Sequence, residues 1–435
     1  MLIPAAALAE LEAKLRGPGA GLRVAAVELD LDPLDLVRAG AAAFPSAVFF
    51  AGPGGRAVGG LGSAWSVRSA GPERFSILDR ALRRSLPDGA GALLGFSFSP
   101  GGPCSEEWDG FAGAVAMVPR IAVWRWGGRS RLCLATPAGG SAAATLATAA
   151  ALRPPAAPEV PRSIEERPGT PPIEAWVDRV SAAVAAIRAG GPAKVVLARA
   201  RRLILERTAA PFDVAAVLRE RCPGCYLYGW QAGAAARVGA SPELLAARAG
   251  RAFETRLLAG SIRRGSDPAE DRRLGDRLLA DPKERAEHAF VVEEVVSHLA
   301  PLASTLELPP GPRLERLAGV QHLATLIGGT TEARLLALVE ALHPTAAVGG
   351  VPRARALAYI GEIEGMDRGW YTGGVGWADP EGDGEVVIAL RCALLREREA
   401  RVYAGAGIVA DSDPAAEAAE TDLKMAPLLG LFSSG

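Results

Sequence analysis

The order of strand-like and helix-like segments constrains the fold of this chain more than any other feature of the sequence. In its second half, a helical pattern at residues 173–189 precedes a strand-like run at 194–205, and a helix at 212–222 precedes two successive strands at 226–232 and 235–240. A doubly wound parallel sheet requires strands and helices to alternate strictly. These segments do not alternate strictly, and the pattern therefore predicts an α+β fold.

The first third of the chain consists of short apolar segments punctuated by Gly and Pro, at residues 47–62, 91–99 and 111–126. Short strands with such turn signals are typical of antiparallel sheet. The sequence then becomes rich in Ala and Gly from residue 138 and in Pro between residues 154 and 161, without a periodic pattern. We predict a linker there. The chain would then divide into a β-rich lobe with its linker (1–165) and a second region (166–435).

The later part of the chain returns to regular patterns. Residues 281–299 place five polar side chains among apolar ones at helical spacing, which predicts a long helix with a polar stripe. These side chains are Glu284, Glu287, His288, Glu294 and His298. Strand-like runs separated by Gly follow at 369–379, 384–395 and 399–409, and a helix is expected from about residue 414.

The charge balance indicates which partners the protein lacks. The 48 Lys and Arg residues face 49 Asp and Glu residues, for a net charge of -1. No overall charge therefore draws the chain to nucleic acid or to an anionic membrane, and an anion must be recognised locally. No apolar run is long enough to span a bilayer, and the first residues read as an amphipathic helix rather than as a secretory signal. We expect a monomer.

The five cysteines argue against a disulfide framework, because their number is odd and only Cys222 and Cys225 lie close in sequence. A single such pair cannot complete a four-thiolate zinc site. Reduced thiols in the cytoplasm are the expectation, and the residues do not assign a role to the pair.

Two patterns near the C-terminus could carry chemistry. Glu417, Glu420 and Lys424 are spaced to share one helical face, where they could bind a cation and an anion together or form a solvated salt-bridged stripe. Gly405 and Gly407 either let a backbone N–H approach a ligand or form an ordinary β-bend. These residues alone leave both questions open and do not define a reaction.

A set of motifs resembles the chorismate-utilising enzymes. They occur in that family's order over roughly residues 170–433, namely KVVLAR, GASPELL, LLAGSIRRG, KERAEH, QHLAT, HPTAAVGG, YTGGVGW, IALRC, YAGAGIV and ETDLK. The resemblance implies one α+β unit in which large antiparallel β-sheets pack together with helices outside. Under that fold, the predicted linker would join two lobes of one unit.

Two positions indicate which reaction the resemblance implies. Lys194 stands where amine-transferring members of the family usually have Gln, which points to water as the nucleophile. Ala347 stands where members that expel pyruvate tend to have Thr. Together they imply an isochorismate synthase of the menaquinone or siderophore type. A salicylate synthase and a noncatalytic chorismate-binding subunit remain alternatives, and the residues do not say whether the product feeds menaquinone, siderophore or salicylate synthesis.

The same resemblance assigns roles within the site. Lys194 would be the general base that activates water, and Glu243 the general acid that protonates the departing hydroxyl. Glu287 and Glu420 would hold Mg²⁺, with Glu417 close by, and this ion would meet the ring carboxylate of chorismate. The remaining positions would contact the substrate: Arg391, Gly405 and Tyr371 at the enolpyruvyl carboxylate, and Gly260, His322, Ala347 and Lys424 in the rest of the pocket.

Overall fold

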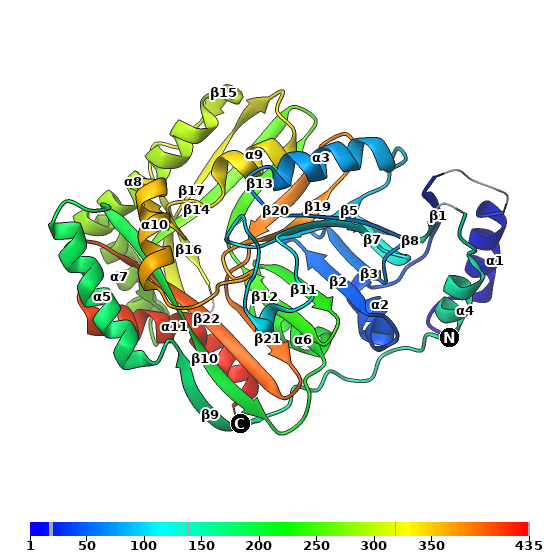
Figure 1. The fold of residues 1–435 in the computed structure, drawn as a ribbon, viewed down its shortest axis with the longest axis horizontal. Helices are drawn as coiled ribbons and strands as arrows, with labels where there is room; N and C mark the ends of the chain where they lie inside the picture. The colour runs from blue at the N-terminus through cyan, green and yellow to red at the C-terminus, as the bar shows by residue number, and fades with distance from the viewer. Residues whose placement is uncertain (17–20, 138, 318, 434–435) are drawn as a thin grey trace.

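Two large antiparallel sheets form the centre of the molecule, and helices cover them (Figure 1). The computed structural model describes residues 1–16, 21–137, 139–317 and 319–433. Within these ranges every strand pairing is antiparallel. The α+β fold with packed antiparallel sheets is therefore confirmed. No helix in the described ranges is long and apolar enough to cross a membrane.

The larger sheet has 12 strands, with β9 paired to β10 beside the main path. In spatial order these are β1 (Arg23–Glu28), β8 (Arg129–Thr136), β7 (Ile121–Trp126), β3 (Ala57–Leu61), β2 (Ser46–Ala51), β11 (Tyr226–Ala232), β12 (Ala235–Ser241), β21 (Cys392–Arg396), β22 (Glu399–Ile408), β10 (Lys194–Leu205) and β18 (Gly350–Val351), with β9 spanning Ser163–Thr170.

The smaller sheet has 10 strands, with β16 paired to β17 beside the main path. In spatial order these are β15 (Ala303–Glu307), β17 (Val320–Thr331), β14 (Ala252–Arg263), β13 (Leu244–Ala249), β20 (Gly384–Ile388), β19 (Gly374–Ala378), β5 (Ala92–Phe96), β6 (Ala114–Val118) and β4 (Trp65–Ser69), with β16 spanning Arg313–Arg316.

The helices lie outside these sheets (Figure 1). They are α1 (Ala5–Lys14), α2 (Pro33–Gly40), α3 (Arg74–Ser85), α4 (Ala143–Ala151), α5 (Ile173–Arg188), α6 (Pro211–Arg221), α7 (Pro268–Ala280), α8 (Pro282–Leu299), α9 (Leu335–Leu342), α10 (Arg353–Ile363) and α11 (Pro414–Phe432), with short 3-10 turns at Ala41–Ala43 and Glu106–Trp108.

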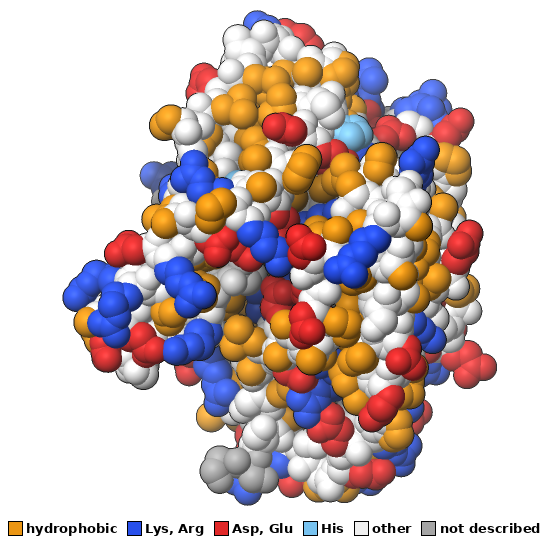
Figure 2. Space-filling view, turned by 90° about the vertical axis from the view of Figure 1, so that its left-hand side faces the viewer, with side chains coloured by type: hydrophobic (Ala, Val, Ile, Leu, Met, Phe, Trp, Pro, Cys, Tyr) orange, Lys and Arg blue, Asp and Glu red, His pale blue; other side chains and the backbone are white. Residues whose placement is uncertain are grey.

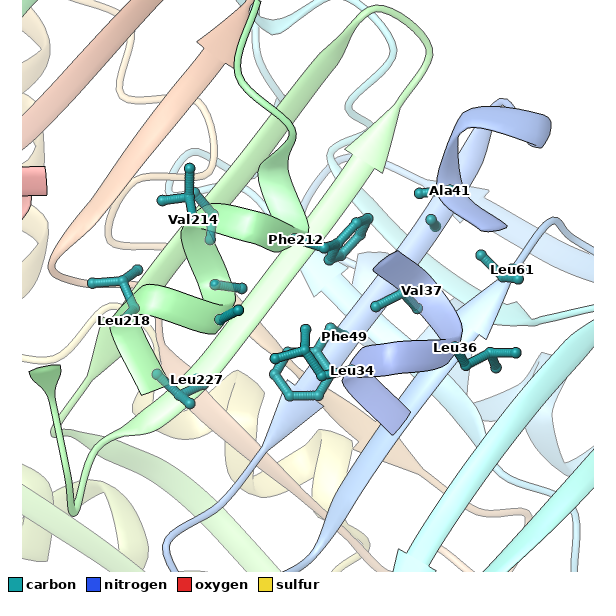
Figure 3. Packing of buried hydrophobic residues seen from close by; sticks show 14 of the residues in the cluster. Leu34, Leu36, Val37, Ala41, Phe49, Leu61, Phe212, Val214, Leu218 and Leu227 are labelled. Atoms are coloured by element: carbon teal, nitrogen blue, oxygen red, sulfur yellow. The ribbon is translucent and has the colours of Figure 1, made fainter. Parts of the chain in front are cut away.

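Helix α2 shows how local sequence and packing agree. Asp32 accepts a hydrogen bond from the backbone N–H of Leu34, and Pro33 occupies the first turn, so the helix has a side-chain cap at its start. Leu34 and Val37 are three residues apart and therefore share one face. Figure 3 shows this face turned toward α6, whose Phe212 belongs to the same buried cluster.

Strands from the first 165 residues enter both sheets. Strand β2 pairs with β11, and β5 pairs with β19. The division that we predicted between residues 165 and 166 falls inside β9. We propose that the two regions form one structural unit.

The predicted linker contains more structure than its composition indicated. Its Ala-rich part forms α4, in which Thr145 and Ala149 are buried. Ala has the highest intrinsic helix propensity, so this segment needs only a surface to pack against. That surface includes α1, a contact between distant parts of the chain that sequence periodicity does not reveal.

Two of the places where the chain crosses between the sheets are adjacent to each other. Strand β12 belongs to the larger sheet and β13 to the smaller one, with residues 242–243 between them. Residues 384–395, which we predicted as one strand, are two: β20 lies in the smaller sheet and β21 in the larger. The break falls at residues 389–391, where Arg391 has a φ of 49°. A positive φ at a residue other than glycine departs from the extended backbone of a strand, and the run is apolar on both sides because both sheets are buried.

Candidate active site

A pocket of about 160 Å³ lies beside these crossings. Its walls come from the start of β10, the β12–β13 crossing, the middle of β14, the first turns of α8, the end of β22 and the first half of α11. The structure brings every predicted site residue to this one pocket. They are Lys194, Glu243, Gly260, Glu287, His322, Ala347, Tyr371, Arg391, Gly405, Glu417, Glu420 and Lys424.

Lys194 is the first residue of β10, and it is only 6% exposed. Its Nζ donates a hydrogen bond to Oε1 of Glu287, on α8, at 2.7 Å. Gly407 on the neighbouring strand makes room for this pair, because a Cβ at that position would lie 2.8 Å from Cε of Lys194 and 3.3 Å from Oε1 of Glu287. The amine is therefore closely held at one wall of the pocket.

Glu243 lies at the crossing from β12 to β13 and is 2% exposed. Its backbone carbonyl accepts a hydrogen bond from the N–H of Ile388 at 3.1 Å, which joins the two crossings. Burial raises the pKa of its carboxyl group to about 8, and its Oε1 has no hydrogen-bond partner. At neutral pH this side chain is therefore mostly protonated and can donate a proton.

Arg391 lies at the second crossing. Its Nη1 donates to the carbonyl of Lys424 at 3.2 Å, and its Nη2 donates to Nε2 of His322 at 3.1 Å. No carboxylate in the described part of the chain lies within 4 Å of its guanidinium. A half-buried guanidinium without a counter-ion is costly, so the pocket is suited to an anion at this point.

His322 is neutral in this arrangement. Burial, together with the nearby Arg391, lowers its pKa to about 3. Because Nε2 accepts from Arg391, the ring proton is on Nδ1, which lies 3.2 Å from the carbonyl of Gly260 and 3.0 Å from Oγ of Ser261. Both ring nitrogens are engaged, so His322 supports Arg391.

Gly260 forms a bulge in β14, where the register shifts between Ala259 and Ser261. Its φ is 79°, a conformation that favours glycine. A Cβ there would lie 2.9 Å from Oε2 of Glu284, a side chain that accepts a hydrogen bond from the backbone N–H of Ser261 at 3.3 Å. The bulge thus brings the backbone of β14 against the start of α8.

Lys424 on α11 links two other predicted residues. Its Nζ pairs with Oε1 of Glu420 at 2.9 Å and donates to the carbonyl of Gly405 at 3.0 Å. A Cβ at Gly405 would lie 3.3 Å from the hydroxyl of Tyr371, whose ring stacks on Tyr403 with the centroids 5.3 Å apart. This wall of the pocket is therefore built from β22, α11 and the segment before β19.

Four carboxylates line the side of the pocket formed by α8 and α11, namely Glu284, Glu287, Glu417 and Glu420. Burial and the neighbouring Glu420 raise the pKa of Glu417 to about 7. Burial and then the charge of Glu287 raise the pKa of Glu284. Within the described ranges no three acidic, His or Cys side chains converge tightly enough to hold a metal ion as they stand.

The chemistry of these groups nonetheless fits a hard divalent cation. Carboxylate oxygens are the ligands that Mg²⁺ prefers, and a cation would offset the negative charge by which Glu420 raises the pKa of Glu417 and Glu287 raises that of Glu284. Glu287 and Glu420 each pair with a lysine here, so either side chain would turn from its lysine to bind a metal.

Two pocket residues, and a third residue that acts on Glu243 from outside the pocket lining, escaped the sequence-based assignment. Glu284 lies one helical turn before Glu287, and that spacing on the polar stripe could have identified it. Ser261 follows the glycine of the bulge and contacts His322. Arg256 lowers the pKa of Glu243 against the effect of burial, and no sequence signal marks it, because the two residues meet only through the pairing of β13 with β14.

The surface around the helices has no dominant sign of charge in the view of Figure 2, where Lys and Arg side chains lie among Asp and Glu side chains. Because the charges on this face are mixed, they do not create a positive surface that would attract anions. Arg391, which lines the pocket, supplies such an attraction.

Comparisons with known proteins agree with this geometry. The family model described as "Chorismate binding enzyme" matches residues 17–433. A curated relative, the salicylate biosynthesis isochorismate synthase of Pseudomonas aeruginosa, is 39% identical over 398 residues, which cover 86% of this chain and 82% of that protein. The isochorismate synthase EntC of Escherichia coli is 42% identical over 197 residues, which cover 45% of this chain and 50% of that protein.

Solved structures show the same architecture. The menaquinone-specific isochorismate synthase MenF of Escherichia coli superposes with a TM-score of 0.87 at 28% identity, covering 98% of this chain and 99% of that one. Anthranilate synthase component I of Streptococcus pneumoniae superposes with a TM-score of 0.73 at 24% identity over 87% of this chain and 93% of that one, a likeness of fold alone. The chain belongs to the chorismate binding enzyme family.

Proposed function

We propose that this chain is a Mg²⁺-dependent isochorismate synthase, an isomerase that adds water at C2 of chorismate while the C4 hydroxyl leaves. The observation that carries the proposal is that a buried amine, Lys194, and a buried protonated acid, Glu243, line one pocket. The relatives named isochorismate synthase in Pseudomonas aeruginosa and Escherichia coli support it.

Glu243 is the proposed general acid. Hydroxide is a poor leaving group, so the departing C4 oxygen needs a proton as its bond to carbon breaks. The raised pKa of Glu243 keeps that proton available at neutral pH. The crossing holds the side chain in place through the hydrogen bond between its own carbonyl and the N–H of Ile388.

Lys194 is the proposed general base. A neutral amine at this position takes the proton from the water that attacks C2, and the ring double bonds shift toward C4 as its hydroxyl departs. Nζ of Lys194 pairs with Oε1 of Glu287 at 2.7 Å. Because Glu287 is also a proposed metal ligand, its engagement by the metal would free Nζ to contact the attacking water.

The carboxylate of the enolpyruvyl arm is proposed to meet Arg391, with Tyr371 and the backbone of Gly405 alongside it. Arg391 is suited to this because its planar fork can donate two parallel hydrogen bonds and lacks a carboxylate partner among the described side chains. His322, Lys424 and Gly260 would complete this part of the wall by hydrogen bonding and shape.

The residues proposed to hold Mg²⁺ are Glu287 and Glu420, with Glu417 nearby and Glu284 added by its place in the pocket. When bound, the ion would neutralise the ring carboxylate of chorismate and draw electron density toward it. The carboxylates of α8 and α11 would thereby orient the ring between Lys194 and Glu243.

Ala347 is proposed to stop the reaction at isochorismate. Its side chain is a methyl group on the pocket wall, and it has no hydroxyl group that could assist the elimination of pyruvate. A salicylate synthase would release pyruvate and salicylate from the same mixture, and a noncatalytic subunit would release nothing.

The test is to incubate the purified chain with chorismate, with and without Mg²⁺, and to identify the products by chromatography. We expect isochorismate, formed only with the metal and without pyruvate. Accumulation of pyruvate would replace this proposal with the salicylate synthase, and no turnover would favour the noncatalytic subunit. Monomeric state and a cytoplasmic location remain predictions, the latter consistent with the free thiols of all five cysteines.

A further inference from the structure

A second pocket, of about 760 Å³, lies apart from the one described above. Its lining residues come from the start of α3, the loop after β5, the end of α9 and one side of α10. Its lining shares no residue with the pocket that Lys194 and Glu243 line, which we call the chorismate pocket. We call it the Arg74 pocket, after the residue that distinguishes it; its walls include Phe75, Phe98, His343, Pro344 and Leu357.

Arg74 is a buried cation without a counter-ion. It is 3% exposed, and only its Nη1 is engaged, donating to Oγ of Ser97 at 3.2 Å and to the carbonyl of Ser99 at 2.6 Å. No carboxylate in the described ranges lies within 4 Å of it, and burial lowers its pKa to about 10. Keeping an unpaired guanidinium away from water is costly, so this side chain is placed to receive an anion.

The other charged groups of the Arg74 pocket, apart from an exposed carboxylate at its rim, already have partners. Arg368 pairs with Glu364 at 2.6 Å, and Arg353 pairs with Glu294 at 3.2 Å. Asp367 accepts hydrogen bonds from the backbone of the loop after β5. Among the described lining residues, Arg74 is thus the one cation that lacks a carboxylate.

The walls beside Arg74 are aromatic. Its guanidinium lies 4.7 Å from the ring centroid of Phe75. The ring of His343 stands edge-on to Phe75 and to Phe98, with centroids 6.4 Å and 6.3 Å apart, and burial lowers its pKa to about 3, so it is neutral. Pro344 and Leu357 extend the apolar lining. A flat apolar group would pack favourably against these rings.

An exposed carboxylate stands at the rim of the pocket. Glu340 is exposed there, and its charge acts on Arg74 across the opening. It would repel a second negative charge on a ligand, so the pocket favours a monoanion over a dianion.

We propose that the Arg74 pocket is a binding site for a small aromatic monocarboxylate, whose carboxylate pairs with Arg74 while its ring packs against Phe75 and Phe98. The site is separate from the chorismate pocket, so such a ligand binds together with the substrate.

Gly361 offers a way to block the pocket without disturbing its walls. It lies on α10, lines the pocket, and has nothing within 4 Å of an added Cβ. Gly361→Phe therefore places a ring into the space meant for the ligand. Gly361→Ala is the matched control, because it changes the same helical position but adds only a methyl group, which favours the helix.

The experiment is calorimetric titration of the full chain with benzoate. We expect saturable binding to one site, weakened about tenfold or more by Arg74→Gln, which removes a charged hydrogen-bond donor, and likewise by Gly361→Phe. Gly361→Ala, and Arg391→Gln in the other pocket, should bind benzoate within about twofold of the parent protein. Acetate, which lacks the ring, should bind about tenfold more weakly than benzoate.

Several results would overturn the proposal. The proposal fails if benzoate does not bind saturably, or if it binds equally to the parent protein and to Gly361→Phe. It also fails if acetate and benzoate bind equally well. Loss of benzoate binding in Arg391→Gln alone would assign benzoate to the chorismate pocket. Circular dichroism of each variant guards against misfolding, and Gly361→Phe keeps the test valid if Arg74→Gln does not fold. None of these readouts depends on turnover of chorismate.

Discussion

Glu243 and Arg391 occupy the two adjacent crossings between the sheets, and hydrogen bonds tie the crossings together. Ile388 donates its N–H to the carbonyl of Glu243 at 3.1 Å, and Ala240 donates its N–H to the carbonyl of Arg391 at 3.1 Å. A crossing interrupts the strand, so its side chain can turn out of the sheet into the pocket. The proposed acid and the proposed anion-binding residue are thus fixed relative to one another by backbone rather than by flexible side chains.

The raised pKa of Glu243 predicts how stability depends on pH. Its pKa in the folded protein, about 8, lies above its ordinary value of 4.5, so its contribution to stability is fully present below 4.5 and is lost as pH rises through about 8. Gln at this position carries no ionisable proton, so Glu243→Gln should escape this loss of stability, which amounts to as much as about 5 kcal/mol. Urea unfolding of both proteins between pH 5 and pH 9 measures the difference, and parallel curves would show that Glu243 ionises as freely as in water.

The same pKa bears on turnover. A general acid works only while protonated, so the rate should fall as pH rises above about 8. Glu243→Gln should lose about 10²- to 10⁴-fold in kcat, because it cannot donate a proton to the leaving hydroxyl. A pH–rate profile followed by isochorismate formation checks both statements. An undiminished rate well above pH 8 would assign the acid to another group.

Lys194→Ala should lower kcat by about 10²- to 10⁴-fold and leave the binding of Mg²⁺ intact or stronger. The change removes the base, and it also removes the cation that pairs with Glu287 in the absence of a metal. Steady-state kinetics and calorimetric titration with Mg²⁺ separate the two effects. Lys14→Ala, an exposed lysine on α1, is the control and should match the parent protein. Turnover that survives in Lys194→Ala would refute the base assignment.

Gly407→Ala should displace the base without unfolding the protein. The added Cβ would lie 2.8 Å from Cε of Lys194, and the long lysine side chain can yield more easily than the sheet. Misplacement of a catalytic group by about 1 Å can cost about 10²-fold, so we expect a fall of that size in kcat with little change in melting temperature. Gly361→Ala serves as the glycine control. A Gly407→Ala protein with full activity would mean that the position of Lys194 does not matter.

Ala347→Thr should increase the release of pyruvate. The substitution places a hydroxyl on the pocket wall, where it can form a hydrogen bond with bound isochorismate, and the resemblance to pyruvate-expelling members of the family motivates it. A coupled assay for pyruvate, run beside the parent protein and Ala347→Val, measures the effect. The valine variant is close to threonine in shape and lacks the hydroxyl, so equal pyruvate release by both would count against a gating role for this position.

Much of the secondary structure could be predicted because local signals agree with the final packing. The helix predicted at 281–299 is α8, whose start is capped by Asp281, and the strand predicted at 194–205 is β10. The break at residues 389–391 was missed because VVIALRCALL is apolar on both sides of Arg391, and apolar character does not tell which of two buried sheets a residue joins. Helix α4 was missed for a related reason, since its packing surface comes from α1.

The candidate site was predicted through family motifs rather than through spacing. Glu417, Glu420 and Lys424 share a helical face, which spacing revealed, but spacing did not separate a pocket from a solvated stripe. Lys194, Glu243 and Arg391 lie far apart in the sequence and meet only where the sheets and helices pack together. Arg256 and Ser261 are both on β14, and each matters through a residue near the neighbouring strand: Glu243 beside β13 and His322 on β17. No local sequence pattern specifies these pairings, so both residues were missed.

The measurement that tests the central claim most directly is turnover of chorismate in water enriched in ¹⁸O, with mass spectrometry of the product. If Lys194 activates water for attack at C2 while Glu243 protonates the departing hydroxyl, the isochorismate formed should carry one ¹⁸O atom at C2, and neither Lys194→Ala nor Glu243→Gln should form it at a comparable rate. Isochorismate without the label would mean that the hydroxyl migrates within the substrate, and it would contradict the account.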